Sequence, residues 1–251
     1  MQNPKTILIT GASSGIGEAL AHHYAKSGVT LVLTGRNPER LTRVEMTCRE
    51  RGATVITRTI DVGDEIAMAD WIAEIDAQTP LDLVIANAGI SGGASGGLDT
   101  ATREIFRINV EGTFNTVHPA LTAMRSRRRG QIALVSSLAG YIGMPSAPGY
   151  GASKAAVRSY GEALRGRYAA AGIEVSIISP GFIVSGITEK NKFPMPFLMK
   201  ADKAAGIIAR GLARNKSRIA FPWPMYAAIR LAAMLPVFVT EKLFGRLPAK
   251  D

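Results

Sequence analysis

Two side chains that can exchange protons lie four positions apart, Tyr150 and Lys154. On a helix this spacing places both on one face, so the phenol and the ammonium group can be neighbours. A nearby cation favours the phenolate and should lower the pKa of a tyrosine from its usual value of about 10. Such a phenol suits the interconversion of a hydroxyl and a carbonyl group. The pair alone is a weak signal, because two residues at this spacing often occur by chance.

A glycine-rich loop is the second feature that could carry chemistry. Residues 10–17 read TGASSGIG, and they stand between an apolar run and a helical pattern. Glycines let the backbone approach a pyrophosphate, and the start of a helix offers it unpaired N–H groups. The spacing Gly-x3-Gly-x-Gly differs from the commoner G-x-G-x-x-G, but its position between strand and helix is the one that a dinucleotide site requires. The expected contacts are Gly11, Ser13, Ser14, Gly15, Ile16 and Gly17.

The end of the second apolar run bears on which dinucleotide binds. An acidic residue there would bind a ribose 2′-hydroxyl, whereas a cation suits a 2′-phosphate. This chain has Gly35, which lacks a side chain, and then Arg36, whose guanidinium offers a planar set of donors. The sequence therefore favours NADP(H), with NAD(H) left open. The alternative is that Arg36 is only a solvated residue at a strand end.

Other short motifs follow in a fixed order along the chain. They are Asn87-Ala88-Gly89, Asn109 within a helical pattern, Ser137 thirteen positions before Tyr150, and Pro180-Gly181. With TGASSGIG and the Tyr-x3-Lys pair, this order resembles the short-chain dehydrogenase/reductase family over residues 5 to about 188. The combination is far more specific than any of its parts.

The resemblance implies a role for each of four residues. Tyr150 would be the general acid–base residue, and Lys154 would lower its pKa and hydrogen-bond the nicotinamide ribose. Ser137 would position the substrate oxygen, and Asn109 would hold a water that continues a proton relay from Lys154. Taken singly, Asn109 could be a buried residue that bends a helix, Ser137 a strand cap and Tyr150 a core aromatic.

The resemblance also implies contacts with the cofactor beyond the glycine-rich loop. These are Asp61 and Val62 at the adenine, Asn87, Ala88 and Gly89 at the adenosine ribose, and Pro180, Gly181, Ile183 and Ser185 near the nicotinamide, with Tyr150 and Lys154.

The elements that must position these residues alternate along the chain. Apolar runs predict strands at 5–10, 29–34, 53–59, 82–86, 131–136, 173–179 and 217–221, and helical patterns predict helices at 15–27, 38–51, 64–78, 100–127, 149–170 and 200–213. Strands rich in Val, Ile and Leu that alternate with helices indicate a parallel sheet with right-handed crossovers. We expect a single doubly wound, Rossmann-type α/β domain of about seven strands over residues 1–221.

Two segments bear on the substrate. A lid is expected at about 186–199, and its apolar residues, with Met144, favour an apolar or acyl substrate; they are Phe193, Met195, Phe197, Leu198 and Met199. An apolar extension follows at 222–251, in which Pro236 separates two helices that are each too short to span a bilayer.

One face of this extension carries Val239, Leu243 and Leu247, and Lys242 and Arg246 flank that face. Coverage of the extension by the chain itself or by a second subunit is favoured over contact with an anionic membrane surface.

Composition excludes several classes. Of 251 residues, 47% are hydrophobic and 20% charged, which is enough apolar material for a sizeable core. The one cysteine cannot form an internal disulfide, and the three histidines lack metal-site spacing, so no metal is expected. The net charge is +10, but its densest run, residues 125–129, lies at a predicted helix end, where cations complement the dipole. No nucleic acid is expected.

These features together predict an NADP(H)-dependent oxidoreductase that transfers a hydride between the nicotinamide and a carbonyl or secondary alcohol. We expect a small-molecule substrate, a homodimer or homotetramer, and a cytoplasmic location, with peripheral contact at the inner membrane face left open. The alternative is a catalytically silent NADP-binding sensor or scaffold of the same fold. A related epimerase or dehydratase is disfavoured, since the chain has no room for the larger C-terminal substrate domain.

Overall fold

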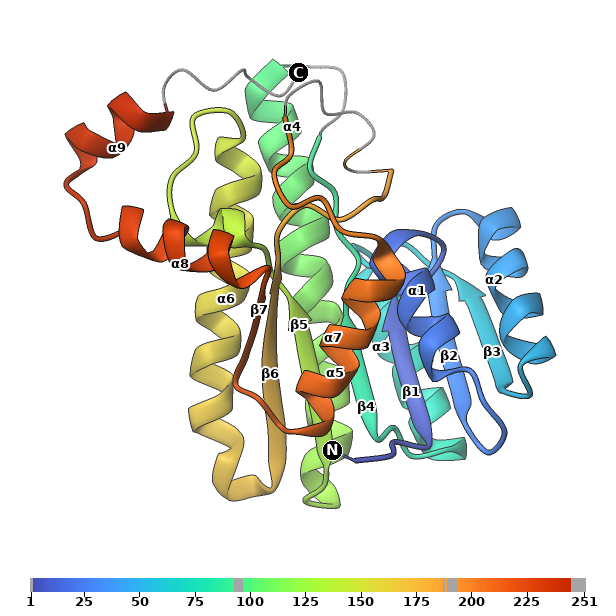
Figure 1. Cartoon of the computed structure of the whole chain (residues 1–251). Coiled ribbons are helices and arrows are strands. Elements are labelled where there is room, and N and C mark those ends of the chain that lie inside the picture. Colours follow the sequence, from blue (N-terminus) through green and yellow to red (C-terminus); the bar gives the residue numbers. More distant parts are fainter. Residues whose placement is uncertain (1, 93–96, 187, 189–193, 245–251) are drawn as a thin grey trace.

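Seven parallel strands form one sheet in the computed structural model, which describes residues 2–92, 97–186, 188 and 194–244 (Figure 1). The strands are β1 (Thr6–Thr10), β2 (Thr30–Gly35), β3 (Thr54–Thr59), β4 (Leu83–Ala86), β5 (Gly130–Val135), β6 (Ile173–Pro180) and β7 (Arg218–Phe221). Their order in the sheet is β3-β2-β1-β4-β5-β6-β7. The predicted doubly wound fold is confirmed. The order reverses direction between β1 and β4, which is where ligands bind in such sheets.

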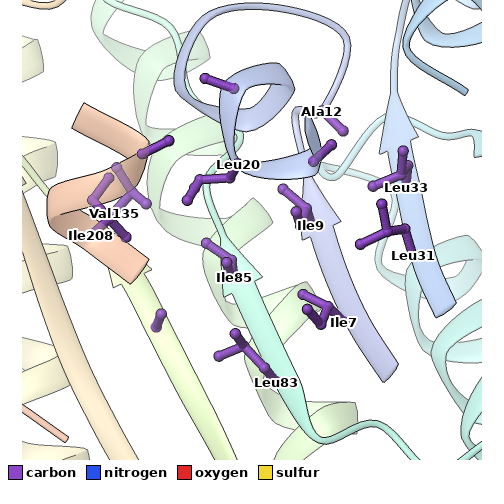
Figure 2. Packing of buried hydrophobic residues seen from close by; sticks show 14 of the residues in the cluster. Ile7, Ile9, Ala12, Leu20, Leu31, Leu33, Leu83, Ile85, Val135 and Ile208 are labelled. Carbon is purple, nitrogen blue, oxygen red and sulfur yellow. The ribbon is translucent and has the colours of Figure 1, made fainter. Parts of the chain in front are cut away.

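Both faces of the sheet are buried, because successive side chains of a strand point to opposite sides. Ile7 and Ile9 of β1 pack under α1 (Gly15–Tyr24), α2 (Pro38–Glu50) and α7 (Ala201–Ala213), as Figure 2 shows in part. Leu8 packs on the other side with α3 (Glu65–Gln78), α5 (Gly112–Ser126) and α6 (Pro148–Tyr168). The apolar runs of β1, β4 and β5 therefore correspond to strands with no solvent-facing side, whereas the edge strand β3 keeps Thr54, Arg58 and Thr59 exposed.

Helix ends follow local side-chain chemistry. The side chain of Asn37 accepts a hydrogen bond from the Arg40 N–H at 2.8 Å, so Asn37 caps the start of α2. Helix α1 ends at Tyr24, three residues before the predicted end. Ala25 already has extended backbone, and Gly28 adopts a left-handed φ of 75° in the turn that returns the chain to β2.

The single helix predicted at 100–127 is wrong in detail. The structure has α4 (Gly97–Phe106), a π-helical turn (Arg107–Glu111) and then α5. Asn109 lies in the π-helical turn and its side chain binds the backbone of Ile90, so the wider turn accompanies a long-range contact that no local pattern encodes. A 3₁₀ turn (Leu138–Tyr141) between β5 and α6 was likewise not predicted.

The C-terminal extension forms two short helices on either side of Pro236, α8 (Trp223–Ala232) and α9 (Val237–Phe244). No residue of α8 is buried. Of the predicted apolar face, the side chain of Leu243 and residue Leu247 lie outside what the structure describes, as does the flanking Arg246. Across the described ranges, every helix is too short or too polar to cross a lipid bilayer.

The basic run at 125–129 begins where α5 ends, as predicted, and one of its members is a structural anchor. The Arg127 guanidinium donates to both carboxylate oxygens of Asp76, at 2.8 and 2.9 Å, and to the Leu81 carbonyl at 2.7 Å. Asp76 also accepts the Leu81 N–H at 2.9 Å. This group joins the end of α5 to α3 and to the start of β4. The neighbouring Arg129 approaches Asp82 only to 3.6 Å and is 71% exposed.

We expect Arg127→Ala to lower the free energy of unfolding by about 1–3 kcal/mol, because it strips the charge partner from a carboxylate that is only 14% exposed. Arg129→Ala is the matched control, and its exposed pair should contribute less than about 0.5 kcal/mol. Urea unfolding of both variants at neutral pH measures the difference. Equal losses would contradict the anchor assigned to Arg127.

Candidate active site

The predicted site residues lie where the strands end, along the carboxyl edge of the sheet, at the top of Figure 1. The glycine-rich loop there has the shape of a phosphate cradle. Gly11 and Gly15 adopt left-handed φ values of 64° and 60°, and a Cβ on Gly17 would lie 2.2 Å from the Gly11 carbonyl oxygen. Ser14 precedes α1 without capping it, so its side chain leaves the N–H groups of the first turn to a ligand.

The end of β4 is bonded directly to this loop. The N–H groups of Asn87 and Ala88 donate to the Thr10 hydroxyl at 3.0 and 3.1 Å. The Asn87 amide also donates to the carbonyls of Thr10 and Gly11, at 2.9 and 3.2 Å. The structure therefore brings Asn87 and Ala88 together with the loop. Thr10 was not predicted as a site residue, although its place directly before Gly11 could have indicated it.

The end of β2 packs against the glycine-rich loop at Ser13. A Cβ on Gly35 would lie 2.9 Å from the Ser13 hydroxyl oxygen, so only glycine permits this approach. Arg36 follows directly and is exposed. Its guanidinium is therefore open to a ligand bound beside the loop.

Asp61 lies near Arg36 and pairs with a second cation, Arg107. It accepts the Gly63 N–H at 2.9 Å and a guanidinium N–H of Arg107 at 3.0 Å. Burial acts to raise the pKa of Asp61, but these two donors, with Arg36 nearby, hold it below its usual value. Arg107 is a residue of this candidate site that the sequence did not indicate, since no motif marks its position 46 residues from Asp61.

Val62, the other predicted adenine contact, is buried, and its carbonyl accepts from the Asn115 amide at 2.9 Å.

Lys154 is almost fully buried. It is 4% exposed, and its Nζ donates to the Val135 carbonyl at 2.9 Å. Burial lowers the pKa of Lys154 to about 8, because a low-dielectric surrounding disfavours the ammonium. The Nζ atom lies 5.9 Å from the ring centroid of Tyr150, one helical turn earlier on α6.

The expected lowering of the Tyr150 pKa by Lys154 is not found. Burial raises the pKa of Tyr150, and the opposing effect comes from a hydrogen bond with the Ser137 side chain. The reason is geometric, since the ammonium is directed at the Val135 carbonyl rather than at the phenol. Ser137 also caps the 3₁₀ turn, because its hydroxyl oxygen accepts the Ala139 N–H at 3.1 Å. It is thus both a cap and a neighbour of the phenol.

Asn109 joins the π-helical turn to the segment after β4 and to α6. Its Oδ1 accepts the Ile90 N–H at 2.8 Å, and its Nδ2 donates to the Ile90 carbonyl and to the Ser153 hydroxyl, both at 2.9 Å. A Cβ on Gly89 would lie 3.1 Å from both Asn109 Oδ1 and Lys154 Nζ, so these two groups converge there. Ser153 was not predicted, although it directly precedes Lys154.

The loop after β6 reaches back to the phosphate cradle. The Gly181 N–H donates to the Phe221 carbonyl at 2.8 Å, which fixes the turn after Pro180. Ile183 is buried, and the Ser185 Cβ lies 3.1 Å from where a Cβ on Gly15 would be. Of the predicted lid residues, Phe197 and Leu198 are exposed, Met195 and Met199 are partly buried, and Phe193 lies outside the described residues.

Comparison with known proteins agrees with this geometry. Residues 5–194 match a family described as short chain dehydrogenase. An uncharacterised oxidoreductase of Myxococcus xanthus is 37% identical over 240 residues, covering 92% of this chain and 93% of that protein.

Two solved structures share the fold at 25% identity. One is a short chain dehydrogenase/reductase from Burkholderia phymatum in complex with NAD (TM-score 0.82, covering 99% of this chain and 98% of that one). The other is a putative NAD(P)-dependent gluconate 5-dehydrogenase from Beutenbergia cavernae with bound NADP (TM-score 0.76, covering 86% and 93%). This chain therefore belongs to the short chain dehydrogenase family of oxidoreductases.

Proposed function

We propose that this protein is an NADP(H)-dependent reductase of a ketone or aldehyde, acting reversibly on the corresponding alcohol. The observation that carries the proposal is the convergence of Tyr150, Ser137 and buried Lys154 beside a glycine cradle shaped for a pyrophosphate. NADPH oxidation measured against a panel of 3-oxoacyl thioesters, steroids and aromatic aldehydes tests it directly.

A bound nicotinamide dinucleotide would supply the hydride that the carbonyl carbon receives. The side chains of Ser137 and Tyr150 would hold the carbonyl oxygen, and the Tyr150 hydroxyl would give that oxygen its proton. Because burial raises the pKa of the Tyr150 phenol, the phenol is protonated at neutral pH and is available as the proton donor in reduction. Lys154 would bind the cofactor ribose, and Asn109 would hold a water that returns a proton toward Lys154.

The choice of NADP(H) rests on Arg36. Arg36 follows Gly35 at the end of β2, beside the glycine-rich loop. Neither residue is acidic, so this position lacks the carboxylate that would bind the ribose 2′-hydroxyl of NAD. Under this proposal Gly11, Gly15 and Gly17 bind the pyrophosphate. The adenine would lie by Asp61 and Val62.

A substrate with apolar character is favoured by the half-buried Met144 and Met195 and the exposed Phe197 and Leu198 after β6. The proposal includes assembly as a homodimer or homotetramer, which light scattering measures. A silent NADP-binding sensor or scaffold fits less well, because cofactor binding alone does not require Ser137 to hydrogen-bond the Tyr150 phenol.

Tyr150→Phe should lower kcat by about 10²–10⁴-fold, because it removes the proton donor but not the ring. Its Kd for NADPH should stay within about twofold of wild type. Lys154→Ala should weaken both cofactor binding and turnover, since Lys154 would bind the cofactor ribose and also take part in the proton relay. Steady-state kinetics and fluorescence titration separate these effects, with circular dichroism as the folding control. Wild-type kcat in Tyr150→Phe would refute the mechanism.

The preference for NADPH should depend on Arg36. Wild type should show higher kcat/KM with NADPH than with NADH, and Arg36→Ala should reduce that ratio by roughly 10- to 100-fold through the loss of a charge-assisted contact. Arg43→Ala, an exposed change on α2, is the control and should leave the ratio unchanged. If both variants keep the wild-type ratio, Arg36 is only a solvated residue.

Ser137→Ala should shift the pH profile of alcohol oxidation to higher pH. The hydrogen bond with Ser137 lowers the pKa of Tyr150, so its loss raises that pKa, and the phenolate that accepts the proton forms only in more alkaline solution. The measurement is kcat/KM for oxidation against pH in both proteins. An unchanged or more acidic limb in the variant would argue against this role of Ser137.

A further inference from the structure

The exposed apolar side chains of this protein are concentrated at one end. In the described ranges, twelve large hydrophobic side chains are exposed, and two of them, Met46 and Ile66, lie on α2 and α3. The other ten follow the carboxyl ends of β4, β6 and β7 and are here named the apolar rim; they are Leu98, Val184, Phe197, Leu198, Trp223, Leu231, Met234, Leu235, Val237 and Phe238.

The part of the rim on α8 is presented by an anchored helix. Tyr226 accepts a hydrogen bond from Arg218 of β7 at 3.1 Å, and its ring meets that of Tyr141 edge to face at 5.5 Å. A Cβ on Gly181 would lie 2.9 Å from Met225 Sδ. These contacts fix one side of α8 against the domain. Trp223, at 72% exposure, and Met234, just beyond α8 and at 81%, are not covered by the domain.

Six side chains of the apolar rim lie within residues 223–238, and exposed apolar clusters on proteins mark interaction sites. Helices α8 and α9 have ten and eight residues, which is too short to span a bilayer but long enough to lie in its interface. Within the described residues 194–203 and 222–244, four Lys or Arg residues stand against two Asp or Glu residues; they are Lys200, Lys203, Arg230 and Lys242 against Asp202 and Glu241. This excess of cations complements anionic headgroups.

A second copy of the chain is the other candidate cover. Pairing through the rim about a two-fold axis would set the same edge of both subunits face to face, and that edge holds Ser137 and Tyr150. Access to both proposed active sites would then be obstructed. A lipid surface would instead supply an apolar substrate to the edge of the sheet that holds the site. This step rests on the proposed function.

We propose that the apolar rim docks on the surface of an anionic lipid bilayer, with α8 and α9 in the plane of the interface.

The chain carries its own fluorescent reporter for the test. Of its two tryptophans, Trp71 is fully buried in the core and Trp223 is exposed on α8. Vesicles of phosphatidylcholine with phosphatidylglycerol should float the protein and shift Trp223 emission to shorter wavelength, and both effects should weaken with added salt. Vesicles of phosphatidylcholine alone should bind it more weakly. Failure to float with the anionic vesicles at low salt would overturn the proposal.

Matched variants locate the contact. Met234→Ser with Phe238→Ser should lower vesicle partitioning about tenfold or more, because two large apolar side chains no longer enter the interface. Ile66→Ser removes a side chain that is 74% exposed on α3 and should bind vesicles as wild type does. An equal loss in both variants would overturn the assignment to the rim.

Light scattering without vesicles tests the competing cover. If the double variant dissociates an oligomer that wild type forms, the rim is a subunit interface and the proposal fails. An unchanged oligomeric state supports it. Vesicle binding requires no turnover, so an inactive protein that still binds anionic vesicles would refute the proposed function alone.

Discussion

The burial of the Lys154 ammonium is the constraint on which the site depends. The residue is tied to the end of β5 by two reciprocal hydrogen bonds, from its Nζ to the Val135 carbonyl and from the Ser136 hydroxyl to its own carbonyl, at 2.9 and 2.7 Å. These bonds hold α6 against the end of β5. Tyr150, one helical turn before Lys154, is thereby placed beside Ser137. Lowering the pKa of Lys154 from 10.5 to about 8 corresponds to about 3 kcal/mol against folding at neutral pH.

The sheet then assembles the rest of the site around that helix. Thr10 at the end of β1 accepts from the backbone after β4, Asn109 joins that same segment to α6 through Ser153, and Ser185 after β6 lies against Gly15. Each of these contacts links residues that are far apart in the sequence. These contacts can form because, in a parallel sheet, the loop after every strand begins at the same edge.

Sequence patterns predicted what is encoded locally. Continuous apolar runs predicted the strands, and the glycine loop was placed by its position between a strand and a helix. A Cβ on Gly11 would lie 2.8 Å from Ala88 Cα, so the close approach there requires glycine. What could not be predicted depends on tertiary contact. The π-helical turn goes with the bonds between Asn109 and Ile90, and the pair of Arg107 with Asp61 spans 46 positions. The exposure of Trp223 depends on which side of α8 faces the domain.

The pKa of Tyr150 shows why spacing alone cannot give electrostatics. Four residues of separation put a cation on the same helical face, but the direction of Nζ and the burial of both groups decide the outcome. Burial acts in opposite senses on the two partners, raising the pKa of the phenol and lowering that of the ammonium. Each shift favours the uncharged form of its group, so the proton of Tyr150 stays on the phenol oxygen. That oxygen lies next to the Ser137 side chain, where a carbonyl oxygen would need a proton during reduction.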